Sequence, residues 1–320
     1  MQLPPRAARA LKLARLGRVA AELAWPLGTW FTHRGKGALV QVENTSYCNF
    51  RCTYCVTHSP SSLVPLRRGH MTMATYTRIL DDNPRARVVV IQGDGEPLLD
   101  PTVFDKLRVA RERGLATQII SNGSQLKPAM IERLLAEGPD VFLVSLDAVS
   151  AETNERNRRG LDYAQVTASL AELCARRERY PRIVGLLSVV HGAFTDETAA
   201  ALRDFDRIGI DVLFYKQLNR AFEGRIAGYQ GGEAEGVPAA VRRALSYPIS
   251  HQRISSITPC PQLRFELPYY LWDGQQTACC ILNSERYAAP EYQHAALLER
   301  WRAGAMPSEC EGCSYFAGYR

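Results

Sequence analysis

Three cysteines stand close together in the first quarter of the chain, at Cys48, Cys52 and Cys55. Thiolates at this C-x3-C-x2-C spacing can hold three corners of an iron–sulfur cube and leave the fourth iron without a protein ligand. An open metal position can bind a small chelating cofactor, as catalytic metal sites do and closed structural sites do not. The spacing differs from the C-x2-C-x2-C run of ferredoxins and from the paired C-x2-C motifs of zinc ribbons. On these residues alone, a zinc knuckle is the alternative.

The run from Cys48 to Cys55, which includes Tyr54 just before the third cysteine, resembles the signature of the radical S-adenosylmethionine (radical SAM) superfamily. The resemblance implies an enzyme that binds a 4Fe–4S cluster and S-adenosylmethionine (SAM), with Tyr54 beside the cofactor. It also implies an electron donor such as flavodoxin or ferredoxin. In that superfamily SAM binds the open iron and is split to a 5′-deoxyadenosyl radical, which removes a hydrogen atom from the substrate.

A second group of cysteines lies near the C-terminus. Cys260, Gly274 and Cys279 fit a C-x13-G-x4-C pattern, and Cys310 and Cys313 supply a C-x2-C pair. These spacings resemble the SPASM/twitch extension of radical SAM enzymes in its shorter, twitch form. The resemblance implies a second, auxiliary 4Fe–4S cluster that four thiolates close. A structural zinc site uses the same four ligands and is the alternative.

From residue 38 onward, short apolar runs alternate with helical stretches. The predicted strands are Leu39–Glu43, Arg87–Gln92, Thr117–Ser121, Val141–Ser145, Ile183–Val190 and Ile210–Tyr215. The predicted helices occupy residues 73–82, 102–113, 128–137, 162–178 and 195–208. Continuous apolar strands that alternate with helices indicate an α/β fold with a parallel sheet. The superfamily resemblance refines this prediction to a partial (β/α)6 barrel with a small twitch-type extension.

Functional residues of such sheets gather at the carboxyl ends of the strands. After the second predicted strand, Gly93-Asp94-Gly95-Glu96 resembles the superfamily's Gly-Gly-Glu motif, with Asp94 in place of the second glycine. The resemblance implies that this segment contacts SAM. Asn122 follows the third strand and Ser145 ends the fourth, in a Ser-Leu-Asp sequence that resembles the subgroup with C-terminal clusters. Both are expected to contact SAM or the substrate.

Two further side chains have expected roles. The subgroup resemblance implies an arginine that clamps the SAM carboxylate, and Arg158, with Arg159 as the alternative, is the candidate because a planar guanidinium matches a carboxylate. A solvated helix start is the alternative for both arginines. Cys280 neighbours Cys279 and could replace it as a cluster ligand. If Cys280 is free near the barrel mouth, it could return a hydrogen atom to a substrate radical, as thiols do in radical SAM epimerases. Simple packing is the alternative for this cysteine.

The net charge of +6 lies in the first 36 residues, which hold seven basic side chains and one acidic one. Leu13 and Leu16 belong to an apolar stripe at helical spacing, which predicts a basic amphipathic helix. We expect this helix to cap the open bottom of the barrel. The alternative is peripheral membrane contact through residues 1–30, with Trp25 and Trp30 in the interface. The chain lacks an apolar run that would predict a membrane span or a secretory signal, so a cytoplasmic enzyme is expected. A nucleic-acid partner is disfavoured because the remaining residues carry balanced charge.

Four segments are predicted: a leader over 1–37, the partial barrel over 38–218, a connector over 219–255 and an auxiliary cluster domain over 256–320. The main functional hypothesis is hydrogen abstraction from a polar small molecule, sugar- or aminocyclitol-like, by analogy with a twitch-type aminocyclitol dehydrogenase. The reaction would end in oxidation or epimerisation with the help of the auxiliary cluster. The alternatives are a maturase of a ribosomally synthesised peptide, an enzyme acting on a lipid-linked substrate, and a non-enzymatic zinc-binding adaptor.

Overall fold

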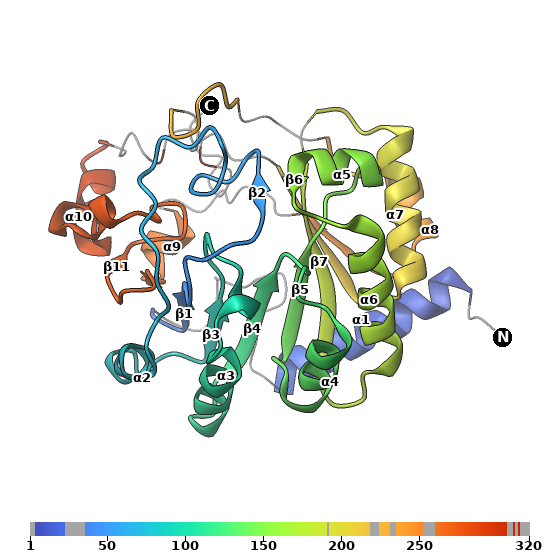
Figure 1. Cartoon of the computed structure of the whole chain (residues 1–320), viewed down its shortest axis with the longest axis horizontal. Helices are drawn as coiled ribbons and strands as arrows, with labels where there is room; N and C mark the ends of the chain where they lie inside the picture. The colour runs from blue at the N-terminus through green and yellow to red at the C-terminus, as the bar shows by residue number, and fades with distance from the viewer. Residues whose placement is uncertain are drawn as a thin grey trace.

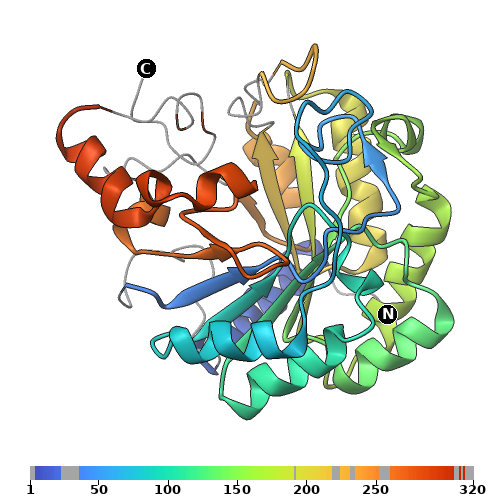
Figure 2. The same cartoon turned by 60° about the vertical axis from the view of Figure 1, so that its left-hand side comes forward.

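The computed structural model describes residues 4–22, 36–190, 192–217, 224–230, 235–251, 260–305, 310 and 313. Its main feature is a nine-stranded sheet, parallel except at one edge, with the strand order β11-β10-β1-β3-β4-β5-β7-β8-β9 (Figures 1 and 2). The strands are β1 (Leu39–Val42), β3 (Val88–Ile91), β4 (Ala116–Ser121), β5 (Val141–Ser145), β7 (Ile183–Val190), β8 (Val212–Gln217), β9 (Ile249–His251), β10 (Tyr269–Tyr270) and β11 (Gln276–Thr277). A separate antiparallel ladder pairs β2 (Arg51–Cys52) with β6 (Arg158–Arg159).

The six parallel strands from β1 to β8 correspond to the six strands predicted from the sequence. They lie side by side in chain order, as expected when every crossover has the same hand. Helices link them in turn: α2 (Met73–Asp82), α3 (Val103–Glu112), α4 (Pro128–Glu137), α5 (Ala151–Asn157), α6 (Tyr163–Arg176) and α7 (Asp196–Ile208). β1 and β3 are buried at every position, which explains why β3 is wholly apolar and why Gln41 is the single polar residue of β1. The prediction of an α/β fold built on a parallel sheet is confirmed.

Alternate strand residues face two different cores, as the twofold period of a strand requires. On one face, Val40 and Val89 pack with the helices that link the strands. On the other face, Leu39 and Val88 pack with Leu16 of α1 (Pro5–Glu22). In Figure 1, α1 accordingly lies behind the strands while α3 and α4 lie in front of them.

Helix α1 covers the amino ends of the strands, as the cap prediction expects. Lys12 Nζ donates to Ile210 O just before β8 and to Ser246 Oγ at 3.2 Å. Leu13, which was assigned to the apolar face, is instead 48% exposed. Trp25 and Trp30 lie outside the described residues. In the described ranges, no helix has the length and apolarity that a membrane crossing requires.

The C-terminal part extends the barrel sheet and also has a small core of its own. β10 pairs in parallel with β1, and β11 folds back antiparallel on β10, so this hairpin continues the sheet beyond β1. Tyr287, Leu297 and Trp301 pack together with the C-terminal cysteines. The remaining elements are α8 (Ala239–Ala244), α9 (Pro261–Arg264), α10 (His294–Arg302) and the 3-10 turns η1 (Pro97–Leu99), η3 (Glu285–Ala288) and η4 (Pro290–Tyr292). The predicted domain boundaries stay predictions.

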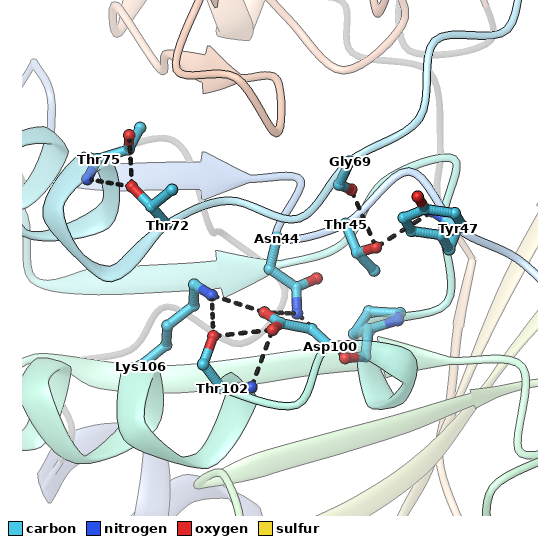
Figure 3. Close-up of polar contacts among 10 residues, drawn as sticks. Asn44, Thr45, Tyr47, Gly69, Thr72, Thr75, Asp100, Thr102 and Lys106 are labelled. Carbon is cyan, nitrogen blue, oxygen red and sulfur yellow. Dashed lines mark hydrogen bonds and ion pairs between the residues drawn. The ribbon is translucent and has the colours of Figure 1, made fainter.

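A buried polar network fixes the chain just before the first cysteine loop (Figure 3). Asp100 accepts a hydrogen bond from Asn44 Nδ2 at 2.9 Å and forms an ion pair with Lys106 at 2.6 Å. Thr102 also donates to Asp100, from its backbone amide and its hydroxyl. The Lys106 and Asp100 side chains are both fully buried. Because every partner supports the others, the network holds the end of β1 against the turn that follows β3.

Replacement of Lys106 by methionine should destabilise the protein by about 3–5 kcal/mol, because it leaves the Asp100 carboxylate buried without a cation. Chemical denaturation measures this loss. The matched control is Lys127→Met, whose side chain is exposed and whose loss should change stability by less than about 0.5 kcal/mol. Equal effects of the two substitutions would show that the buried ion pair does not hold this region.

Candidate active site

The loop after β1 carries the first three cysteines, and their sulfurs accept hydrogen bonds from nearby N–H groups. Phe50 N donates to Cys48 Sγ at 3.4 Å, and His58 N donates to Cys55 Sγ at 3.2 Å. Burial raises the pKa of all three thiols, that of Cys48 to about 12. Thiolates at these positions therefore need the positive charge of bound metal, which N–H donors to sulfur complement. The donor set fits an iron–sulfur cluster with three protein ligands.

An ion pair on the barrel side fastens this loop. Arg158 donates from Nε and Nη2 to both oxygens of Asp147, at 3.0 and 2.7 Å, and both side chains are buried. The Tyr54 hydroxyl also donates to Asp147, and the Arg158 guanidinium lies 5.4 Å from the centre of the Tyr54 ring. Arg158 is paired with Cys52 in the β2–β6 ladder. Two N–H groups of Arg158 thus donate hydrogen bonds to Asp147. That Arg158 clamps the SAM carboxylate and that Tyr54 contacts SAM stay predictions.

The segment after β3 packs closely against the entry to the cysteine loop. A Cβ atom on Gly95 would lie 2.0 Å from Thr45 O, so only glycine fits there. Glu96 is buried and accepts hydrogen bonds from Asn122 N at 2.6 Å and from Ser121 Oγ at 2.7 Å. Burial raises the pKa of the Glu96 carboxyl to about 7. Glu96 therefore ties the ends of β3 and β4 together, while SAM contact by Gly93, Asp94, Gly95 and Glu96 stays a prediction.

The residues expected after β4 and on β5 lie on the same rim. Asn122 Nδ2 donates to Asn49 Oδ1 at 3.0 Å and reaches Cys48 Sγ at 3.8 Å, so this side chain borders the cysteine loop. Ser145 is the half-buried last residue of β5 and aligns with Leu187 of β7. Their contacts with SAM or substrate are not tested and remain predictions.

The C-terminal cysteines line one small cavity. Its lining includes Cys260, Cys279, Cys280, Cys310 and Cys313. Burial, together with the neighbouring sulfurs, raises the pKa of Cys279 well above its usual range. In the described ranges, no three His, Cys, Asp or Glu side chains converge tightly enough to chelate one metal ion. The four predicted ligands therefore line the same cavity. Because Cys280 lines it as well, the structure leaves open whether Cys279 or Cys280 would be a cluster ligand.

A larger cavity, of about 560 Å³, opens at the carboxyl ends of β1 and β3. Its deep end holds Glu43 and Asp94, and Asp94 N donates to Glu43 Oε1 at 3.2 Å. Burial and the neighbouring Asp94 carboxyl raise the pKa of Glu43 to about 8, and burial raises the pKa of Asp94 to about 6. Asp94 also accepts hydrogen bonds from the hydroxyl of Thr57 and from Asn283 Nδ2, the latter at 2.7 Å. The cavity therefore lies between the cysteine loop and the C-terminal segment.

Several residues of this cavity were not predicted from the sequence. Glu43 directly follows the buried strand β1, and an acidic residue at that strand end is a signal that could have identified it. Arg225 and Asn283 lie in the predicted connector and extension, where no motif marks them. Arg225 donates from Nη2 to Asn283 Oδ1 at 2.7 Å, so tertiary contact alone brings these two residues together.

Comparisons with known proteins agree with the fold and the cysteine loop. A family model described as the radical SAM superfamily matches residues 42–212. AdoMet-dependent heme synthase of Methanosarcina barkeri is 35% identical over 38% of this chain and 34% of its own length. PqqA peptide cyclase of Granulibacter bethesdensis is 32% identical over 36% of this chain and 30% of its own length. The chain thus spans about a third of the length of these curated relatives. The crystal structure of Streptococcus suis SuiB bound to precursor peptide SuiA has a TM-score of 0.60 at 14% identity, covering 94% of this chain and 73% of SuiB.

The fold and the cysteine loop define a radical SAM enzyme. Because the family model matches more than half of the chain, the protein belongs to the radical SAM superfamily. Enzymes of this superfamily use a 4Fe–4S cluster and SAM, and Cys48, Cys52 and Cys55 are the residues of this chain that would hold the cluster. The predicted recognition of the superfamily and of its cofactors is confirmed.

The expected substrate was wrong. The sequence analysis favoured a sugar- or aminocyclitol-like small molecule, whereas the relatives include a peptide cyclase and a structural neighbour that was solved with a precursor peptide. The prediction relied on an analogy between enzymes that share cluster motifs. Cluster motifs describe the radical source and contain no contact with the substrate, so the analogy could not identify it.

Replacement of Asp147 by asparagine should loosen the cysteine loop, because Arg158 then remains buried without its carboxylate partner. In protein reconstituted with iron and sulfide, we expect a chelator to remove iron from the N-terminal site at least about tenfold faster, equivalent to about 1.4 kcal/mol. The visible absorption of the cluster reports the rate. Asp105→Asn, at an exposed position paired with Arg108, is the matched control. Unchanged iron loss in the Asp147 variant would refute the anchoring role.

Proposed function

We propose that this enzyme modifies a peptide by hydrogen abstraction, with the reacting residue held in the 560 Å³ cavity. The observation that carries the proposal is the position of this cavity. Thr57 lies two residues after Cys55 and Asn283 four residues after Cys279, and both line it. A substrate in the cavity would therefore lie beside the radical source and close to the C-terminal cysteines. The volume falls within the range of about 300–1,000 Å³ that is typical of ligand sites.

The rim of the cavity suits an extended chain. Residues 61–67, here called the rim segment, leave the cysteine loop and pair with the chain around Arg225 and Ile226 through Leu63 N to Arg225 O at 2.9 Å and Ala227 N to Ser61 O at 2.7 Å. Leu63 is 62% exposed beside the opening. An opening with apolar side chains on its edge and charged side chains inside can take both the backbone and the side chains of a peptide.

The residues of this chain would position the reactants. Asp147, Arg158 and Glu96 hold the loop and strand ends in place, so that the radical source and the cavity keep a fixed relative position. When bound, the cluster and SAM supply a radical that removes a hydrogen atom from the substrate. We further propose that an auxiliary 4Fe–4S cluster in the segment 256–320 is held by Cys260, Cys279, Cys310 and Cys313. The proposed organisation of the rest of the chain is a leader over 1–37, the partial barrel over 38–218 and a connector over 219–255. An external electron donor belongs to the same proposal.

The type of reaction is part of the proposal. Oxidation and epimerisation were expected from the sequence, and Cys280 would be the hydrogen donor in an epimerase. Because one relative is named a PqqA peptide cyclase, bond formation within a peptide is a third candidate reaction. In all three reactions the first event is the same loss of hydrogen from the substrate, so the cavity and the radical source would serve each of them.

Transfer of deuterium tests the proposal. The short peptides encoded next to the gene for this protein are prepared with fully deuterated amino acids and incubated with reconstituted, reduced enzyme and SAM. We expect 5′-deoxyadenosine that carries deuterium, together with a mass change in one peptide, both measured by mass spectrometry. Cys52→Ala should abolish both signals because it removes a cluster ligand, and Cys174→Ala, in helix α6, should retain them.

Unlabelled 5′-deoxyadenosine with every peptide would contradict a peptide substrate. An iron tetrapyrrole is tested in parallel as a substrate, because the Methanosarcina barkeri relative is named an AdoMet-dependent heme synthase. Hydrogen loss from that compound, with no transfer from any peptide, would assign the cavity to a different substrate.

A further inference from the structure

The two carboxyl groups at the deep end of the cavity accept hydrogen bonds from neutral donors. Glu43 receives the backbone amides of Asp94 and Trp272 at 3.2 and 3.3 Å. Asp94 receives the hydroxyl of Thr57 and the carboxamide of Asn283. Glu43 is only 4% exposed. Two adjacent buried carboxyls held by neutral groups favour the arrival of a positive charge, since burial without a cation is costly.

Arg67, Arg225 and Arg286 line the cavity, and the hydrogen bonds of the first two go to groups other than the deep carboxyls. Arg67 forms ion pairs with Asp273 at 3.1 Å and Glu285 at 2.6 Å, at the exposed edge. Arg225 donates to Ile281 O and to Asn283 Oδ1, both at 2.7 Å. Asn283 thus stands between Arg225 and Asp94, accepting from the first and donating to the second. The rim acids pair directly with Arg67. Glu43 and Asp94 accept hydrogen bonds from neutral donors, and the charge of Arg225 partly offsets the rise in the pKa of Asp94.

The walls between the rim and the deep end are partly apolar. Leu63, Val64 and Pro65 of the rim segment line one part of the cavity, and Leu271 and Trp272 of the C-terminal hairpin line another. Such surfaces suit methylene groups. A long side chain with an aliphatic stem and a charged head matches this combination, as the stems of lysine and arginine pack on apolar surfaces while their heads reach polar groups.

Local packing keeps Glu43 in this position. A Cβ atom built on Gly93 would lie 2.6 Å from Glu43 Cγ and 2.9 Å from the Tyr269 hydroxyl. Any larger residue at position 93 would therefore displace the Glu43 side chain. The glycine leaves the room that this carboxyl occupies.

We propose that Glu43 and Asp94 bind the cationic head of a lysine or arginine side chain of the peptide substrate, with its stem between the rim segment and Trp272. This inference rests on the proposed function and adds the residue class that the cavity selects. Glu43 and Asp94 act here in substrate recognition.

Binding of three synthetic peptides to reconstituted enzyme with SAM tests the proposal without turnover. The peptides are acetyl-Gly-Ala-X-Ala-Gly-amide, where X is lysine, norleucine or glutamate, and calorimetry gives their affinities. Norleucine keeps the stem of lysine and lacks its charge. We expect the lysine peptide to bind at least about tenfold more tightly than the norleucine peptide, as charge-assisted hydrogen bonds contribute. Glu43→Gln and Asp94→Asn should each reduce this ratio at least about threefold, and Glu112→Gln, which removes an exposed acid paired with Arg108 on helix α3, should leave it nearly unchanged.

The inference would be overturned by equal binding of the three peptides, by no binding of the lysine peptide at millimolar concentration, or by an unchanged ratio in both deep-end variants. If Glu43→Gln weakens SAM binding and spares the lysine preference, the pair serves the ammonium group of SAM and the proposal is wrong. Deuterium transfer from a peptide that lacks basic residues would keep the proposed function and remove this recognition role. These outcomes therefore distinguish a failure of the proposed lysine or arginine recognition from a failure of the proposed peptide modification.

Discussion

The ion pair between Asp147 and Arg158 connects the cysteine loop to the barrel, and the geometry of the site depends on it. Asp147 lies two residues after the end of β5, and Arg158 lies in the short ladder opposite Cys52. Because both side chains are buried, the pair is shielded from water and its two hydrogen bonds restrict the relative orientation of loop and strand. Tyr54 adds a third contact to the same carboxylate. The cysteine loop, whose regular structure includes the two-residue strand β2, is thereby held at a defined place on the rim.

Buried carboxylates around the site fall into two groups with different surroundings. Asp147 and Asp100 each pair with a buried cation, and Glu96 accepts three hydrogen bonds that join neighbouring strand ends. These groups complete the scaffold. Glu43 and Asp94 lie on the other side of the cysteine loop, face a cavity and accept from neutral donors. The difference between the groups is one of position: the first three carboxyls join parts of the scaffold to each other, whereas Glu43 and Asp94 line a cavity.

The parallel sheet could be predicted because its strands are largely buried and therefore read as mostly apolar runs between amphipathic helices. The cysteine loop could be predicted because ligand spacing is local in sequence. β9, β10 and β11 were not predicted, since strands of two or three residues carry too little pattern and depend on pairing with distant partners. The same reason applies to the site. The sequence does not show that Asp147 comes to lie against Arg158, and Asn283 was missed because only the fold brings it to Asp94.

The central claim is that Cys48, Cys52 and Cys55 hold a cluster with one iron open to SAM. Electron paramagnetic resonance of the reduced, reconstituted chain, recorded with and without SAM, tests this claim most directly. A variant with all three residues changed to alanine supplies the signal of the C-terminal site alone. The account predicts that the difference signal, which belongs to the N-terminal cluster, changes when SAM is added. An N-terminal cluster signal that is identical with and without SAM would contradict it.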